Sequence, residues 1–394
     1  MHNFEYYTPT RIIFGRNAEN MAADLIKRYG GTRVLVHYGQ GSAVRSGLMA
    51  RVKKNLDDAG LFHVELGGVV PNPHLDKVRA GFALGSLNQV DFVLAVGGGS
   101  VIDSAKAIAF ALAEPKENVW DLFERKRQPK ASLPVGSILT ISAAGSEMSR
   151  NVVLTNEQTR KKRGFGDALA RPKFAIMNPD LTMTLPDYQT AAGCVDIMMH
   201  TMERYFTSGG NMQITDAIAE GLLRTVMKNA NILRLNPKSY DARAEIMWSS
   251  SLAHNGLTGC GNDGGDFATH NLEYELSGMF NVTHGAGLAA LWGSWARYVY
   301  KVCLPRFVQF AVNVMGVDAA GKSDDETAIR GIIELENFYR KIGMPTSMSE
   351  LGIKPTDEQI REMAESCEKA TGGSIGSAKR LYFDDMVKIY EAAR

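Results

Sequence analysis

One carboxylate and three imidazoles in the C-terminal half of the chain could bind a metal. Asp196 and His200 are four residues apart in the stretch 195–205, which lacks proline and glycine and is typical of a helix. Their side chains should therefore lie on one helical face, one turn apart. His270 and His284 follow downstream. One carboxylate and three imidazoles suit a divalent transition metal, namely Fe(II), Zn(II), Mn(II) or Co(II).

The alternative for every histidine is an ordinary core or surface position, and no single histidine argues for a metal. The histidines of the first half have no ligand-like partners; they are His2, His37, His63 and His74. His254 lies in a helical stretch rich in small residues, and we interpret it as a core residue or as a neighbour of the ligands.

A glycine-rich turn in the N-terminal half is the second candidate site. Gly97–Gly99 follow the apolar strand 91–96 and precede a helix that contains Ser100 and Asp103. Glycines let the backbone approach a phosphate, and the helix N-terminus offers N–H groups to it. The turn matches neither GxGxxG nor the P-loop pattern, so a tight structural turn remains the alternative. Asp103 is then a first-turn acid favoured by the helix dipole, and Lys106 a solvated residue.

An earlier turn bears on which coenzyme binds. Gly39, Gly41 and Ser42 close the strand 33–38, where an NAD site usually places an acidic side chain for the ribose hydroxyls. No acid stands there, and Arg45 lies nearby. Without an acid, no negative charge at this turn would repel a 2′-phosphate, and Arg45 could donate hydrogen bonds to one. We therefore predict a preference for NADP(H) over NAD(H).

A third turn follows the strand-like segment 135–139. It is rich in small and hydroxyl residues, and its candidate coenzyme contacts are Thr140, Ser142 and Ser149. An ordinary Ser/Gly turn explains the same residues nearly as well.

These turns need a scaffold, and the first half alternates strands with helices. Strands are expected at 11–14, 33–38, 64–66 and 91–96, and helices at 17–28, 48–60 and 76–87. Such alternation favours an α/β, doubly wound parallel sheet. The basic stretch 159–163 is interpreted as a hairpin tip between strands at 151–155 and 174–177.

The second half is helical nearly to its end. Helices are expected at 216–235, 240–254, 286–300, 326–342, 356–368 and 383–393. A segment bounded by Pro179 and Pro186 marks the junction. We therefore predict an α/β dinucleotide-binding domain over 1–186 and an all-helical metal and substrate domain over 187–394.

The bulk composition excludes several classes of protein. A chain of 394 residues with 45% hydrophobic residues can bury a large core, and its formal net charge of +1 favours neither nucleic acid nor a membrane surface as a partner. No secretory signal is recognised at the start, and no apolar run approaches the ~18 residues of a membrane span. The four cysteines are scattered without a CxxC pair, which is typical of buried residues in a reduced, cytoplasmic protein.

Taken together, these segments resemble the iron-containing, group III alcohol dehydrogenase family, and most closely its NADP(H)-using, butanol dehydrogenase-like branch. The matching segments run almost from end to end: 7–15, 70–73, 97–106, 145–147, 171–174, 196–200 and 270–287. The resemblance implies an N-terminal dinucleotide domain, a C-terminal helical domain, an active site in the cleft between them, and a homodimer.

The same resemblance implies roles for individual residues. Asp196, His200, His270 and His284 would bind the catalytic metal, Fe(II) foremost and Zn(II) as the alternative. With the turns described above, the predicted coenzyme contacts are Gly39, Gly41, Ser42, Asn72, Gly97, Gly98, Gly99, Ser100, Val101, Asp103, Thr140, Ser142, Ser149, Lys162, Leu181, Thr184 and Leu185.

Two positions depart from the family pattern. Many relatives carry a histidine where this chain has Tyr274, and tyrosine is a poorer proton carrier at neutral pH. Threonine is frequent where Ala144 stands, so one hydroxyl contact to the coenzyme is lost.

The expected activity is reversible hydride transfer between NADP(H) and a primary alcohol or its aldehyde, with Tyr274 as a candidate member of the proton relay. The alternatives are an NAD-dependent, glycerol dehydrogenase-like enzyme, a dehydroquinate synthase-like lyase, and a non-catalytic protein that binds metal and nucleotide.

Overall fold

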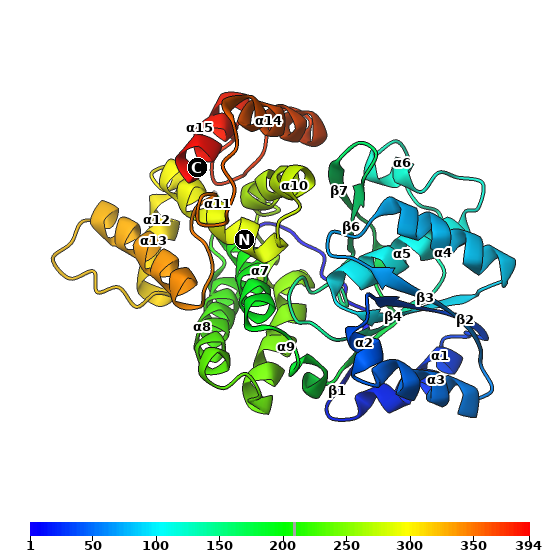
Figure 1. Cartoon of the computed structure of the whole chain (residues 1–394). Coiled ribbons are helices and arrows are strands. Elements are labelled where there is room, and N and C mark those ends of the chain that lie inside the picture. The colour runs from blue at the N-terminus through cyan, green and yellow to red at the C-terminus, as the bar shows by residue number, and fades with distance from the viewer. Residues whose placement is uncertain (208–209) are drawn as a thin grey trace. The chain divides into compact units, whose positions relative to one another are not determined.

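The computed structural model spans the whole chain and describes residues 1–207 and 210–394 (Figure 1). The chain forms two compact units, one made of Tyr7–Thr184 and the other of Leu185–Arg394 together with Met1–Tyr6. The first six residues thus differ from the predicted division, which placed them in the α/β domain. They go with the helical unit, where the backbone N–H of His2 donates to the carbonyl of Gly261 at 2.9 Å.

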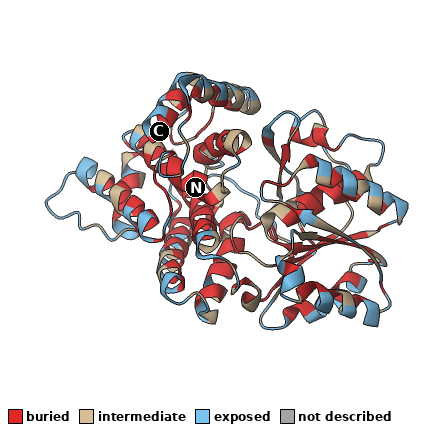
Figure 2. Cartoon of the chain, viewed as in Figure 1, coloured by how far each residue is buried: buried red, intermediate tan, exposed pale blue. Residues whose placement is uncertain are grey.

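The α/β unit is built on a six-stranded sheet in which every neighbouring pair is parallel. In sheet order the strands are β1 (Arg11–Phe14), β8 (Phe174–Met177), β5 (Val135–Leu139), β4 (Phe92–Gly97), β2 (Arg33–Gly39) and β3 (Phe62–Val69). Strands β4 and β5 are buried at every position, as apolar runs covered on both faces should be (Figure 2).

Helices cover both faces of this sheet, as Figure 1 shows. Helices α4 (Leu75–Leu87) and α5 (Gly99–Ala113) lie on one face, and α1 (Ala22–Arg28) and α3 (Leu48–Asp58) on the other. The shorter elements of the unit are α2 (Ser42–Arg45), α6 (Trp120–Phe123), η1 (Ala18–Met21), η2 (Ala168–Ala170) and η3 (Pro179–Thr182). This is the doubly wound architecture expected from the sequence.

The strand order reverses between β2 and β4, because β3 is added on one side of β2 and β4 on the other. In this pairing Tyr38 lies opposite Val96. The turns that follow β2 and β4 therefore open at the same edge of the sheet, at the switch point where doubly wound proteins bind their ligands.

A separate antiparallel hairpin consists of β6 (Asn151–Asn156) and β7 (Lys161–Gly166). The predicted hairpin tip at 159–163 is wrong, because Lys161–Arg163 belong to β7 and only 159–160 lie in the turn. The expected partner strand, 174–177, joins the main sheet as β8, where its backbone pairs with both β1 and β5.

The second unit is helical. Its elements are α7 (Asp187–Tyr205), α8 (Gln213–Leu235), α9 (Tyr240–His254), η4 (Leu257–Gly259), α10 (Ala268–Phe280), α11 (His284–Val299), α12 (Leu304–Asn313), α13 (Asp324–Lys341), α14 (Asp357–Thr371) and α15 (Phe383–Ala393). Helix α7 is buried at every position from Ala191 to Glu203 and packs against α8, α9 and α11 (Figure 2). It is the central helix of this unit.

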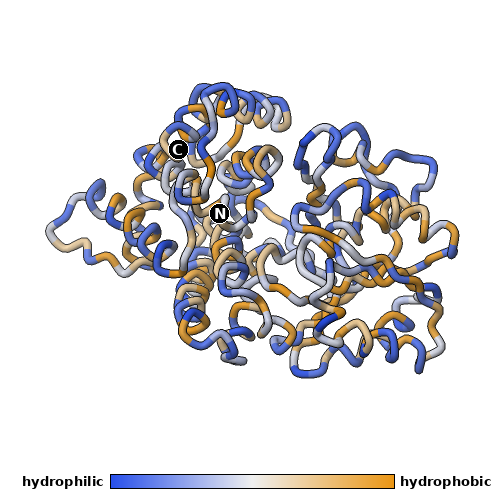
Figure 3. Tube along the Cα trace, viewed as in Figure 1, coloured by the Kyte–Doolittle hydropathy of each residue, from blue (hydrophilic) through white to orange (hydrophobic). Residues whose placement is uncertain are grey.

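The outer helices are amphipathic. Helix α14 is mostly hydrophilic (Figure 3), and its buried residues, Ile360, Met363, Ala364 and Cys367, recur at helical spacing. Thr356 and Gln359 form a capping box at its start. Within the described residues, every helix is too short or too polar to cross a bilayer.

Candidate metal centre

The buried helix α7 presents Asp196 and His200 one turn apart on the same face. Both residues are buried, with 3% and 5% of their surface exposed. Nδ1 of His200 lies 3.0 Å from the backbone carbonyl of Asp196, to which it donates, and 3.0 Å from Oδ1 of the same residue.

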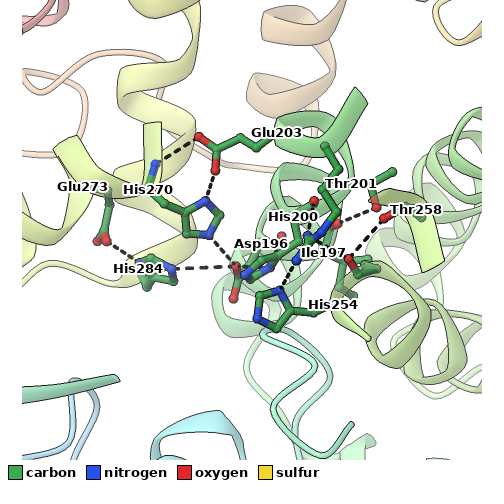
Figure 4. A network of polar contacts seen from close by, with 12 residues as sticks. Asp196, Ile197, His200, Thr201, Glu203, His254, Thr258, His270, Glu273 and His284 are labelled. Atoms are coloured by element: carbon green, nitrogen blue, oxygen red, sulfur yellow. Dashed lines mark hydrogen bonds and ion pairs between the residues drawn. The ribbon is translucent and has the colours of Figure 1, made fainter. Parts of the chain in front are cut away.

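Two further helices bring His270 and His284 to this face (Figure 4). His270 lies in the first turn of α10, and His284 is the first residue of α11. Nε2 of each lies 3.8 Å from Oδ1 of Asp196. One ligand atom from each of the three residues lies within 4.8 Å of the other two. The three atoms can therefore share one ion.

The fourth predicted ligand, His200, lies beside this group but not in it. Its ring centroid is 4.4 Å from that of His270, while its Nδ1 proton is directed to the carbonyl of Asp196. The difference from the predicted set of four arises because the i,i+4 spacing that aligns the two side chains also offers His200 a backbone acceptor. The bond leaves Nε2 as the nitrogen that carries the lone pair.

Two buried glutamates orient the histidines of α10 and α11. Glu203 accepts from Nδ1 of His270 and from its backbone N–H, the latter at 3.1 Å. Glu273 accepts from Nδ1 of His284 and from the hydroxyl of Ser277. These bonds keep the proton on Nδ1 and direct the lone pair of Nε2 toward Asp196, as carboxylates do behind metal-binding histidines.

The sequence reasoning missed both glutamates. A signal was available, since Glu203 stands seven residues after Asp196 and Glu273 three after His270. These spacings keep each glutamate near the metal-facing side of its helix. Only burial, at 1% and 0% exposed, separates them from ordinary solvated glutamates.

The electrostatics of the cluster favour a positive charge. Burial alone would raise the pKa of Asp196, but the imidazoles of His200 and His284 hold it well below its usual range. Burial opposes protonation of His270, yet the carboxylates of Glu203 and Asp196 outweigh it and raise the pKa of His270 to about 9. A divalent cation would supply the charge that these carboxylates stabilise.

Two atoms at the centre of the cluster test whether the residues fit a metal. Oδ1 of Asp196 and Nε2 of His270 are buried, and neither has a hydrogen-bond partner among the residues that the structure describes. Leaving such atoms unpaired costs roughly 1–3 kcal/mol each. A carboxylate oxygen and an imidazole lone pair that face each other across 3.8 Å fit a bridging cation.

His254 supports His200 from α9. Their ring centroids lie 3.9 Å apart, and Nη2 of Arg204 lies 3.2 Å from Nδ1 of His254. Burial and the neighbouring His200 lower the pKa of His254 well below its usual range, so the ring is neutral. This agrees with its interpretation as a neighbour of the ligands.

Tyr274 lies beside two of the candidate ligands. Its ring centroid is 6.2 Å from that of His270 and 6.0 Å from that of His284, and its ring is stacked on the latter. The ring is therefore placed next to the cluster, where the resemblance to the family implied it.

The predicted coenzyme residues of the α/β unit gather at one edge of the sheet. The register places Gly39 beside Val69 and Gly97 beside Leu139. In the same way Leu139 lies beside Met177. The turns after β2, β3, β4, β5 and β8 therefore leave the sheet together. The strand ends, these turns and the helix starts that follow contain Gly39, Gly41, Ser42, Asn72, Gly97, Gly98, Gly99, Ser100, Val101, Thr140, Ser142, Leu181 and Thr184, whereas Leu185 belongs to the helical unit.

Lys162 reaches this edge through the hairpin. It lies opposite Thr155, whose backbone N–H donates to the carbonyl of Pro73 at 2.8 Å. Asn72, just before Pro73, adopts a left-handed backbone with φ of 55°. The structure thus brings together two predicted contacts that are 90 residues apart in the chain.

Asp103 and Ser149 make hydrogen bonds within the protein. Asp103 accepts from the hydroxyl of Ser146 at 2.5 Å and from the backbone of Val153 at 2.9 Å. The hydroxyl of Ser149 accepts from the backbone of Asn151 at 3.0 Å. Both side chains therefore take part in the hydrogen bonding that holds the segments around the turns.

Two family models match the chain. The model described as iron-containing alcohol dehydrogenase matches residues 9–179, and the model of the C-terminal part of the Fe-containing alcohol dehydrogenase family matches residues 190–394.

Individual relatives match over their full length. The chain is 40% identical to a probable NADH-dependent butanol dehydrogenase of Bacillus subtilis, with 100% of both chains covered. It is 35% identical to the NADPH-dependent aldehyde reductase YqhD of Escherichia coli, again with 100% of both covered. The crystal structure of an NADH-dependent butanol dehydrogenase of Thermotoga maritima superposes with a TM-score of 0.95 at 38% identity, covering 100% of this chain and 99% of the other.

Proposed function

Because the chain belongs to the iron-containing alcohol dehydrogenase family, we propose that it transfers a hydride reversibly between NADP(H) and a primary alcohol or its aldehyde. The observation that carries the proposal is the convergence of Asp196, His270 and His284, with both histidines oriented by buried glutamates. His200 completes the proposed ligand set from the same helix as Asp196.

Each residue of the cluster has a task in this reaction. When bound, a divalent ion such as Fe(II) or Zn(II) supplies Lewis acidity, which polarises a carbonyl and lowers the pKa of an alcohol. Asp196 supplies the negative charge that holds the ion, and Glu203 and Glu273 keep the lone pairs of the two histidines directed inward. Tyr274, stacked on His284, is the proposed member of the proton relay.

The metal requirement is tested on the purified enzyme. Its metal content and its reduction of butyraldehyde by NADPH are measured before and after dialysis against a chelator. We expect activity to disappear with the metal and to return on addition of Fe(II) or Zn(II). Full activity in protein shown to be free of metal would contradict the mechanism.

The turn after β2 supports NADP(H) as the coenzyme. It contains no carboxylate, and Nη1 of Arg45 lies 2.9 Å from the point that a Cβ on Gly41 would occupy, so the guanidinium lies over the turn. A guanidinium there suits a phosphate group. The names of the relatives include both coenzymes, so this choice depends on the chain's own residues.

The coenzyme preference is tested by comparing kcat/KM for NADPH and NADH. We expect Arg45→Ala to raise KM for NADPH by about tenfold, the size of one charge-assisted hydrogen bond, and to leave KM for NADH unchanged. Lys54→Ala, which removes an exposed lysine paired with Asp58 on α3, is the matched control. An equal rise in KM for both coenzymes would show that Arg45 does not bind the 2′-phosphate.

A further inference from the structure

A lysine is fully buried inside the α/β unit, remote in sequence from the metal ligands. Lys106 lies on α5 and is 0% exposed. The expectation that it is solvated is therefore wrong. Its Nζ lies 2.8 Å from both the carbonyl and the hydroxyl of Ser146, and 3.0 Å from the carbonyls of Ser149 and Asn151. All these acceptors belong to the segment that follows β5.

Asp103, one turn earlier on α5, binds the same segment and the strand β6 that follows it. It accepts from the hydroxyl of Ser146 and from the backbone N–H of Val153. The Ser146 hydroxyl donates to Asp103 and accepts from Lys106, so it joins the two charged side chains, whose closest atoms are 3.9 Å apart. Lys106 is fully buried, and the side chain of Asp103 is 14% exposed.

The ammonium is positively charged under physiological conditions. Burial lowers the pKa of Lys106 to about 8, against the opposing effects of Asp103 and Glu147. A protonated amine therefore shares three N–H bonds among four acceptors. Hydrogen bonds of a charged donor are stronger than neutral ones, and a buried one strongly specifies the position of its partners.

The segment held in this way, residues 140–151, is here named the serine loop. At its N-terminal end the serine loop contacts the glycine-rich turn, residues 97–99, here called the glycine turn. The backbone N–H of Thr140 donates to the carbonyl of Gly97 at 3.1 Å. A Cβ on Gly98 would lie 1.8 Å from the side chain of Ile141, so even one methyl group would not fit between the two segments. The glycine turn and the serine loop therefore lie side by side at the end of the strands where the coenzyme is proposed to bind.

We propose that Lys106 is a positioning residue that sets the width of the coenzyme site, because it holds the far end of the serine loop on α5, the helix that the glycine turn begins. Asp103 and the Ser146 hydroxyl act with it, rather than touching the coenzyme. The inference rests on the proposed function for its consequence, since a loop released from Lys106 widens the site. The clamp itself can be tested without catalysis.

Two variants test the clamp. Lys106→Met keeps the length of the side chain and removes its charge. Ser146→Ala removes only the hydroxyl that joins Lys106 to Asp103, so it can test the proposal even if the first variant does not fold. Hydrogen exchange of the amides in residues 142–151 measures how readily the loop opens. Fluorescence titration with NADPH and with NADH measures the Kd of each coenzyme.

We expect faster exchange in the serine loop in both variants. Kd for the reduced coenzyme should rise about tenfold or more in Lys106→Met and a few-fold in Ser146→Ala. Metal content and KM for the aldehyde should be unchanged. Asn55→Ala is the control, because its side chain links α3 to η1 and α1 within the same unit and touches neither the glycine turn nor the serine loop in the contacts described.

The outcomes separate the inference from the proposed function. Unchanged loop exchange in Ser146→Ala overturns the clamp. A loop that loosens while Kd stays at the wild-type value overturns its role in the coenzyme site. Wild-type protein that binds neither reduced coenzyme contradicts the proposed function, while the exchange measurement still decides whether the clamp exists. If Asn55→Ala weakens coenzyme binding as much as Lys106→Met and Ser146→Ala do, the effect is only general destabilisation and the proposal is overturned.

Discussion

At the scale of single residues, the proposed metal cluster depends on two glutamates that are not themselves ligands. Nδ1 of His270 and of His284 each bind a glutamate that is buried to more than nine-tenths. A neutral imidazole carries one proton and one lone pair, so whatever fixes the proton on Nδ1 fixes the lone pair on Nε2. The glutamates thus decide whether the histidines can act as ligands.

Glu203→Gln should lower metal affinity by about 10–100-fold, the usual loss for such a partner. The amide would place an N–H group near Nδ1 of His270, and the ring would then favour the proton on Nε2. Metal competition against a chelating dye measures the change.

Glu220→Gln is the control for this substitution. Glu220 is also buried in the helical unit, but it accepts from Tyr205, Gln309 and Asn313. We expect it to lose stability and to keep its metal. Equal metal loss in both variants would mean that Glu203 acts only through stability.

Tyr274→Phe tests the phenol of the proposed relay. The ring remains stacked on His284, so metal content should be that of the wild type, while kcat falls roughly tenfold because a proton donor is lost. The pH profile of kcat and the solvent isotope effect should change with it. An unchanged kcat would remove Tyr274 from the relay and leave water as the proton source.

At the scale of elements, the close approach of α11 to α7 positions His284. A Cβ on Gly285 would lie 2.0 Å from the backbone carbonyl oxygen of Ala192. Ala192 precedes Asp196 by one turn of α7, so the contact lies next to the ligands. A helix backbone, unlike a flexible side chain, cannot move aside to make room.

Gly285→Ala should therefore push α11 away from α7, lower stability by about 1–3 kcal/mol, as overpacking does, and weaken metal binding by tenfold or more. Thermal unfolding and metal content measure the two effects. Gly221→Ala on α8 is the matched control, because its Cβ would meet nothing within 4 Å. The control should be neutral or stabilised by up to about 1 kcal/mol. Metal binding equal to wild type in Gly285→Ala would show that the close approach is not needed.

The parallel sheet would position the proposed coenzyme site in a comparable way. All six strands end at one edge because every neighbouring pair is parallel, and this places the turns that follow the strands together. Lys106 adds a second level of order, since it holds the serine loop on a helix that begins at the glycine turn.

At the scale of the whole molecule, the two units have separate cores and separate dependences on conditions. The proposed metal ligands belong to the helical unit, while a buried histidine makes the α/β unit sensitive to acid. His37 on β2 is 0% exposed, and its ring lies 2.9 Å from both the carbonyl of Leu66 and the hydroxyl of Ser104. Burial lowers the pKa of His37 to about 4.

His37 is therefore protonated below about pH 6.5 in the unfolded chain, but stays neutral in the folded chain until the pH approaches 4. The stabilisation is complete above about pH 6.5 and is lost as the pH falls toward 4. Between pH 7 and pH 5 the loss should be about 2 kcal/mol. His37→Gln should shrink this pH dependence of the unfolding free energy, measured with urea. The same slope in wild type and His37→Gln would contradict the assignment.

Much of this organisation follows from local sequence patterns. Strands at 11–14 and 33–38 and helices at 240–254 and 383–393 are confirmed, because hydrophobic periodicity and capping residues act over a few neighbours. Asp196 and His200 were visible as a pair at helical spacing, whereas the resemblance to the family, and not spacing, implied the full ligand set with His270 and His284.

What the sequence by itself determined is therefore the order of the elements and the chemistry of the candidate ligands. Only the tertiary structure decided which carboxylates orient His270 and His284, where His200 directs its proton, and that Lys106 is buried rather than solvated. The physical reason is that a glutamate or lysine has the same local preferences in water and in a core. Its role depends on desolvation and on partners that are tens of residues away, and these exist only once the chain has folded.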